Sequence, residues 1–146
     1  MEHAQSEFTG EVKPVLYVAD VRRSVDFYRG CLGFEFLFFY DFDNRRSVVT
    51  WEQPYPPRYA EMAAAGQKFG LHLPGCDASR SRVGRQRLYF RVRNLAAQHG
   101  RVSATGIDVG AIVHTAWMDM FDVKDADGHE IVFASTDSSL HTLDPW

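Results

Sequence analysis

Alternating apolar and polar positions near the start of the chain predict a strand followed by a helix. The run EVKPVLYVAD (residues 11–20) alternates Val and Leu with other residues, as strands with one buried face do. Asp20 stands where a helix N-cap is expected, and apolar residues then recur on one face of the segment 21–32. Gly33 follows, at the position where helices commonly end in a left-handed residue.

Three more strands are predicted in the first half of the chain. Residues 34–42 and 46–51 are rich in aromatic and β-branched side chains, and a short turn joins them. Residues 67–73 (QKFGLHL) predict the fourth strand, with His72 between two leucines. The intervening segment 52–66 is predicted to be an insertion with at most a short helix, and its prolines and length make it the candidate for a lid.

The second half of the chain repeats this order. Residues 87–94 (RLYFRVRN) predict a strand, and Asn94 has the N-cap position of a weaker helix that ends at Gly106. The stretches YVADV and RVRNL match in position and chemistry, so we expect an α+β fold made of two β-α-β-β-β modules. The remaining strands of the second module are predicted over residues 107–113, 117–124 and 129–135.

The chain is 146 residues long, which suits one compact domain with a real core. We therefore expect residues 1–146 to form a single domain. Its predicted parts are module one over about 11–74, a linker over about 75–86, module two over about 87–135, and flexible tails over 1–10 and 136–146.

Two phrases of the sequence resemble a known superfamily. VKPVLYVADVRRSVDFYRGCLGFEF and DVKDADGHEIVF look like the vicinal oxygen chelate superfamily, which includes glyoxalase I, extradiol dioxygenases and bleomycin-resistance proteins. The resemblance covers about residues 11–135. It implies curved mixed sheets around a cleft, commonly formed between modules of a dimer. We therefore expect a homodimer, either module-exchanged or side by side.

Composition narrows the classes of function. The hydrophobic fraction is 45%, the aromatic fraction is 14% and the net charge is −3, which indicates a globular protein without a nucleic-acid or anionic-membrane partner. No apolar stretch is long enough to span a bilayer, and the polar start MEHAQSEFTG lacks the features of a signal peptide. Cys31 and Cys76 are too few for a disulfide framework, so a cytoplasmic location is expected.

Strand alternation divides the predicted sheets into two faces. One face is consistently apolar and should pack on the helices: Leu16, Val18, Leu71, Leu73, Leu88, Phe90, Val92, Ile131 and Phe133. The other is mixed, basic and aromatic and should line the concave side: Lys13, Val15, Tyr17, His72, Arg87, Tyr89, Arg91, Glu130 and Val132. A solvated or dimer-buried face with ordinary ion pairs is the alternative to a ligand-lined cleft.

The resemblance implies where a metal would be bound. The metal positions of the superfamily fall here on Lys13, His72, Arg87 and Val132, and only His72 among them could ligate. We therefore predict no metal and no other cofactor, with His72 as a hydrogen-bonding group. The acidic run DADGHE (125–130) is too short for an EF-hand and predicts an Asp-Gly turn between two strands.

The closer resemblance is to the bleomycin-resistance branch, which binds a planar drug between aromatic rings. The resemblance places its aromatic positions on Phe38, Tyr89 and Trp117. A further aromatic position of that branch falls on Asp43, where this sequence departs from the pattern. Flat rings grip planar ligands by stacking. For Phe38 the alternative is simple core packing, since it belongs to a dense aromatic run.

The basic residues change the expected ligand. Lys13, Arg87 and Arg91 suit a carboxylate or phosphate, so a planar ligand with an acidic or polar group fits better than bleomycin itself. The predicted ligand-binding set is Lys13, Tyr17, Phe38, His72, Arg87, Tyr89, Arg91, Trp117 and Glu130.

Three classes of function remain open at this point. The first is a metal-free small-molecule-binding protein. The second is a metal-dependent lyase or dioxygenase with an alternative ligand set such as His72 and Glu130. The third is a metal-free enzyme that uses His72 as a general base, with cationic neighbours that favour the neutral imidazole.

Overall fold

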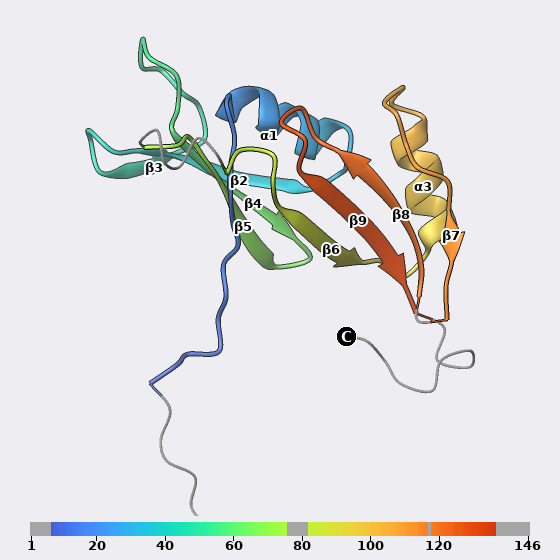
Figure 1. The fold of residues 1–146 in the computed structure, drawn as a ribbon. Helices are drawn as coiled ribbons and strands as arrows, with labels where there is room; N and C mark the ends of the chain where they lie inside the picture. The colour runs from blue at the N-terminus through green and yellow to red at the C-terminus, as the bar shows by residue number, and fades with distance from the viewer. Residues whose placement is uncertain (1–6, 76–81, 117, 137–146) are drawn as a thin grey trace, which may run out of the picture.

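A computed structural model describes residues 7–75, 82–116 and 118–136 of the chain (Figure 1). Trp117, Cys76 and most of the two predicted tails lie outside the described residues. The first half forms β1 (Val15–Tyr17), α1 (Val21–Gly30), β2 (Glu35–Asp41), β3 (Arg46–Val48), β4 (Tyr59–Ala64) and β5 (Gln67–His72). The second half forms β6 (Arg87–Arg91), α3 (Leu95–Ser103), β7 (Val113–His114), β8 (Asp119–Lys124) and β9 (Glu130–Ser135).

The strands form two mixed sheets, one from each half of the chain. The first has the order β1-β5-β4-β2-β3 and the second has the order β6-β9-β8-β7. In each sheet the strand before the helix pairs in parallel with the last strand of its half, β1 with β5 and β6 with β9. The predicted α+β fold of two related modules is confirmed, although β1, β3 and β7 are shorter than the sequence predicted.

The prediction for residues 52–66 is wrong over their second half. Residues 59–64 form β4, which lies inside the first sheet between β2 and β5. The run AEMAA indicates a helix because Ala, Glu and Met favour helices. Pairing on both sides overrides that preference, and Ala60 and Met62 are fully buried. A central strand cannot act as a lid.

The two helices begin as predicted, and they end slightly earlier than predicted, at Gly30 and Ser103. The Asp20 carboxylate accepts a hydrogen bond from the Arg23 amide at 3.0 Å, and the Asn94 side chain accepts one from the Ala97 amide at 2.9 Å. Gly33 and Gly106 follow the two helices with φ of 82° and 86°, a region that other residues rarely adopt. Neither helix in the described part of the chain has the length and apolar character that a membrane span requires.

The apolar faces of both sheets meet in one core. Leu16, Leu71, Ile131 and Phe133 are among its fully buried residues, as the strand alternation predicted. The Phe34 ring lies 4.6 Å from Phe90, so the aromatic core continues from the first module into the second. The two modules are therefore packed on each other rather than linked loosely.

The DADGHE turn joins the two modules. The Tyr28 hydroxyl of α1 donates to Asp125 at 2.7 Å, and the other Asp125 oxygen accepts from the Asp127 and His129 amides. Asp127 in turn accepts from the Ala19 amide at 3.1 Å. Burial, followed by the Asp125 carboxylate, raises the pKa of Tyr28. The predicted turn is confirmed, and it also ties the second module to α1.

His129 makes a second link between the modules. Its ring is fully buried, and Nδ1 accepts from the Gln86 amide at 3.1 Å. Nε2 lies 2.6 Å from the Tyr17 carbonyl and 3.1 Å from the Gly84 amide. The shorter contact is to a carbonyl, which only accepts, so Nε2 carries the proton in a neutral ring. The end of β1 is thereby fixed beside the start of β6.

Candidate functional site: an aromatic patch around His72

His72 lies at the end of β5, on the sheet face that points away from the helices. In the register of the sheet it stands between Tyr17 of β1 and Tyr59 of β4. The ring centroids of Tyr17, Tyr59 and Phe42 lie 6.1, 5.6 and 6.2 Å from the imidazole. We call His72, these three rings and Glu61 the His72 patch. Its imidazole is half-buried, so it remains open to a ligand.

A backbone contact determines the state of the imidazole. Nδ1 of His72 lies against the carbonyl oxygen of Leu73. Because a carbonyl only accepts, Nδ1 must carry a proton, and in the neutral ring Nε2 then carries the lone pair. His72 therefore offers Nε2 as an acceptor when neutral and as a donor when protonated.

Glu61 is the residue of the patch that sequence reasoning missed. It is only 4% exposed, yet it accepts from the Tyr59 hydroxyl at 2.8 Å, and Lys13 Nζ lies 2.5 Å from the same oxygen. Burial and the Glu61 carboxylate raise the pKa of Tyr59. Gly70 makes this arrangement possible, because a Cβ there would lie 2.6 Å from the Tyr59 hydroxyl. The signal was the alternation in YAEMAA, which places an acid between buried neighbours.

Phe38 lies beside this patch. It is half-buried in β2, and after a bulge in the register it stands opposite Glu61. It therefore shares the face of Glu61 rather than the helix-packed face, where Phe36 and Phe39 contact the core.

The other predicted residues gather on the second sheet. Arg87 Nη1 lies 3.3 Å from Glu130, and its guanidinium is 5.2 Å from the Tyr89 ring centroid. Arg91 donates to the Thr136 hydroxyl at 2.5 Å. Lys13 beside the first sheet and Arg87 on the second both have acidic partners. The predicted ligand-binding face is therefore less basic than the sequence predicted.

The residues present do not fit the metal site that the fold implies. Lys13 pairs with Glu61, Arg87 pairs with Glu130, and Val132 is fully buried without a donor atom. Over residues 7–75, 82–116 and 118–136, no group of three or more His, Cys, Asp or Glu side chains could hold a metal ion. His72 with Glu130 is therefore not supported as a ligand set by the described residues.

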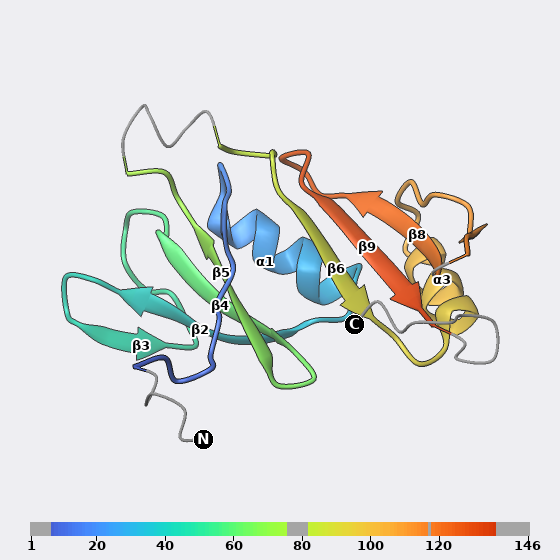
Figure 2. The same cartoon turned by 60° about the horizontal axis from the view of Figure 1, so that its bottom comes forward.

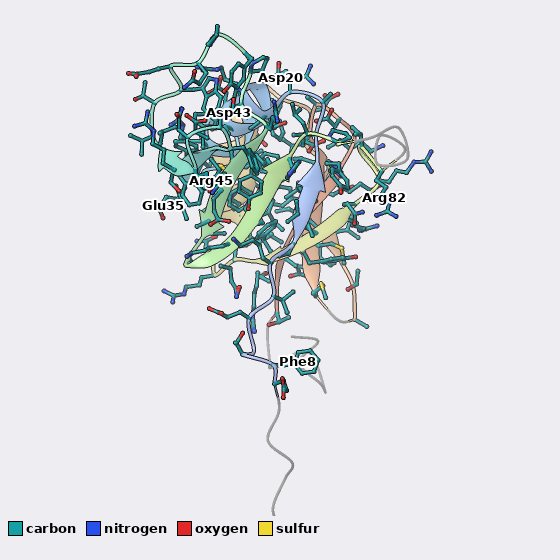
Figure 3. The ribbon with its side chains drawn as sticks, turned by 90° about the vertical axis from the view of Figure 1, so that its left-hand side faces the viewer. Phe8, Asp20, Glu35, Asp43, Arg45 and Arg82 are labelled. Carbon is teal, nitrogen blue, oxygen red and sulfur yellow. The ribbon has the colours of Figure 1, made fainter. Side chains whose placement is uncertain are left out.

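Asp43 stands where the bleomycin-resistance branch is expected to have an aromatic ring. It binds Tyr55, whose ring lies at the edge of the patch. The Tyr55 hydroxyl donates to the Asp43 carboxylate, and the Trp51 indole N–H donates to the Tyr55 carbonyl at 2.6 Å. The neighbouring Phe42 contacts His72. Figure 3 labels Asp43 at the turn between β2 and β3.

We expect Tyr55 to ionise later than an ordinary tyrosine. The hydrogen bond to Asp43 raises the pKa of Tyr55 from 10.0 to about 12. The stabilisation from this bond should be complete below pH 10 and disappear as the pH rises through about 12. Phenolate absorbance during an alkaline titration measures it. In Asp43→Ala one tyrosine should titrate earlier than in the wild type, and an unchanged titration would contradict the assignment.

Sequence and structure comparisons agree with this architecture. A family model described as the Glyoxalase/Bleomycin resistance protein/Dioxygenase superfamily matches residues 10–133, and the chain belongs to that superfamily. No curated protein matches the chain.

Several solved structures share the fold at low sequence identity. TnmS3, an antibiotic binding protein from Streptomyces sp. CB03234, is 20% identical with a TM-score of 0.69, covering 91% of this chain and 100% of that one. An integron cassette protein from the mobile metagenome of V. cholerae is 21% identical with a TM-score of 0.69, covering 92% and 100%. The bleomycin-binding protein of Streptomyces verticillus, complexed with copper(II)-bleomycin, is 17% identical with a TM-score of 0.64, covering 91% and 100%. At these identities the likeness shows the fold alone.

Proposed function

We propose that this chain binds a planar aromatic small molecule with a polar or acidic group, without a metal of its own. The observation that carries the proposal is the His72 patch, where three aromatic rings surround one imidazole on an open sheet face. Rings at these distances can contact a planar ligand with little loss of conformational entropy. TnmS3 and the bleomycin-binding protein are relatives in fold whose names give antibiotics as ligands, which supports the class.

Two polar groups would orient the ligand, His72 in the patch and Lys13 beside it. Nε2 of His72 would accept a hydrogen bond from a ligand hydroxyl or amide, or donate to a carboxylate when protonated. The Lys13 side chain is 45% exposed even with Glu61 as its partner, so its ammonium group would still reach an acidic substituent at the edge of the patch.

The remaining predicted residues would come from a second copy of the chain. Arg87, Tyr89 and Arg91 lie on the other sheet, and the Tyr89 side chain is 44% exposed. In the proposed homodimer this cluster would face the His72 patch of the partner and close the cleft. Trp117 remains a predicted contact, and the cytoplasmic location and the lack of a nucleic-acid partner remain predictions from composition.

A second candidate is a metal-free enzyme that uses His72 as a general base. The hydrogen bond from Nδ1 to Leu73 favours it, because that bond directs the lone pair to Nε2. If His72→Ala abolishes turnover of a ligand but leaves its binding intact, the protein is this enzyme rather than a binding protein.

Calorimetric titration of 2-naphthoate, quinoline and a cationic naphthylammonium tests the binding proposal. We expect wild-type protein to prefer the anionic or neutral ring compounds and His72→Ala to weaken their binding about tenfold. Gly70→Ala should weaken it similarly, because the new Cβ displaces the Tyr59 ring. The control is His114→Ala, whose imidazole is 76% exposed on β7.

Two outcomes would contradict the proposal. Equal affinities in His72→Ala and His114→Ala would place the ligand elsewhere. Preference for the cationic compound would remove the assigned role of Lys13.

A further inference from the structure

A cavity of about 400 Å³ lies between the two modules, apart from the His72 patch. Its walls come from the β4–β5 hairpin and from β6, which lie side by side in Figures 1 and 2. Apolar side chains line it, including Ala64, Phe69, Leu88 and Phe90, and neither His72 nor another member of the patch takes part.

The cavity exists because two strand edges separate at this end of the molecule. β1 pairs with β5 from Val15 opposite Gly70 onward, so among the described residues no strand pairs with β5 before Gly70 on that side. β6 pairs with β9 and forms the edge of its own sheet. At the opposite end His129 ties Tyr17 to Gln86, so the two edges meet there and part towards the cavity.

Strand alternation gives the direction of the backbone amides at the two strand edges. The Gly70 amide donates to the Pro14 carbonyl, and the Lys68 amide, two residues earlier, faces the same side but lies beyond β1. The Val92 amide donates to Ala134 of β9, so the alternate residues Tyr89 and Arg91 direct their amides to the opposite side. Strand alternation therefore directs the amides of residues 68, 89 and 91 away from the paired strands β4 and β9.

The charged residues of the lining are cationic. Lys68 and Arg91 line the cavity together with Gln67, and no acidic residue is among the described residues that line it. No carboxylate in the described part of the chain pairs with the Lys68 ammonium group. An apolar lining with two cationic residues and no acidic one is complementary to an apolar molecule that ends in one carboxylate.

We propose that this cavity is a second binding site, specific for apolar carboxylates, with the hydrocarbon body against Phe69, Leu88 and Phe90 and the carboxylate at Lys68. The site does not rest on the function proposed for the His72 patch, because no member of the patch lines the cavity. Tyr89 and Arg91 line it and also belong to the wall proposed to face the partner's patch. The apolar part of the ligand could be a straight acyl chain or an aryl group. Decanoate and 2-naphthoate distinguish these two.

The test is a calorimetric titration with decanoate, 2-naphthoate and decylammonium, followed by amide chemical-shift mapping. We expect decanoate or 2-naphthoate, but not decylammonium, to shift the amides of residues 64–69 and 88–91. Lys68→Glu should weaken binding about fivefold or more, since an exposed charge pair contributes modestly. Lys124→Glu is the matched control, a lysine on β8 that does not line this cavity.

A second variant tests the same site without the charge change of Lys68→Glu. Ala64→Leu fills the cavity from the end of β4 and should abolish decanoate binding while the far-ultraviolet circular dichroism is unchanged. Unchanged affinity in both Lys68→Glu and Ala64→Leu would overturn the proposal. So would protein concentration-dependent shifts of the same amides without any probe, because a second copy of the chain would then occupy the cavity.

Loss of the shifts at residues 64–69, with retained shifts around His72, would overturn this site and leave the proposed function standing. The reverse result would overturn the proposed function alone.

Discussion

Replacing Gly84 with alanine is expected to lower the free energy of unfolding by about 3 kcal/mol. Gly84 has a φ of 76°, and a Cβ there would lie 1.8 Å from the carbonyl oxygen of Asp127. That oxygen belongs to the backbone of the turn that joins the modules, so it cannot rotate away as a side chain would. The new methyl group would separate the linker from the turn.

Gly106→Ala is the matched control for this prediction. Its φ of 86° imposes the same backbone strain, but nothing lies within 4 Å of its Cβ, so about 1 kcal/mol should be lost. Urea denaturation of the two variants measures the difference. Equal losses would show that the contact between Gly84 and Asp127 does not contribute to the junction of the modules.

Asp125→Ala is expected to cost about 3 kcal/mol, because it leaves several buried donors without an acceptor. The Tyr28 hydroxyl and the amides of Asp127 and His129 all donate to this carboxylate. Tyr28 is itself fully buried, so water cannot replace the lost partner without opening the core.

A control variant and a double variant complete this test. Asp26→Ala removes an exposed carboxylate of α1 that pairs with Arg29, and it should cost less than about 0.5 kcal/mol. Combining Asp125→Ala with Tyr28→Phe should cost less than the sum of the single changes, since the two groups share one hydrogen bond. Additive losses would contradict the link.

Local signals in the sequence predicted most of the fold. The caps at Asp20 and Asn94 and the glycines that follow both helices are determined by residues close in the chain. Strand alternation gave the buried face of most strands correctly, because each has one side against the helices, although Val132, predicted for the concave side, is fully buried as well. β4 could not be found this way, since its alanines become strand residues only through pairing with β2 and β5.

The site was less predictable because it depends on contacts between distant segments. Among the positions where the resemblance implies a metal, His72 was the one residue that could ligate. Its ring neighbours Tyr59 and Phe42 come from a strand and a turn that local sequence patterns did not connect to it. The ion pairs of Lys13 with Glu61 and Arg87 with Glu130 also cross between strands. They reduce the basic character that residue counts alone suggested.

His129 illustrates the same limit. In the sequence it is one histidine without ligand spacing, yet its buried ring connects β1 to the linker before β6. This junction places Tyr17, a member of the His72 patch, and Arg87, a member of the proposed opposite wall, at neighbouring ends of two sheets. The stability of the module junction and the geometry of the binding face therefore depend on the same few residues.

The most direct test of the proposed function follows the imidazole signals of the six histidines by NMR while 2-naphthoate is added. We predict that the His72 signals shift and saturate with the ligand, while those of His114, exposed on the second sheet, do not. Saturable binding that leaves the His72 signals unchanged would contradict the proposal that the His72 patch is the ligand site.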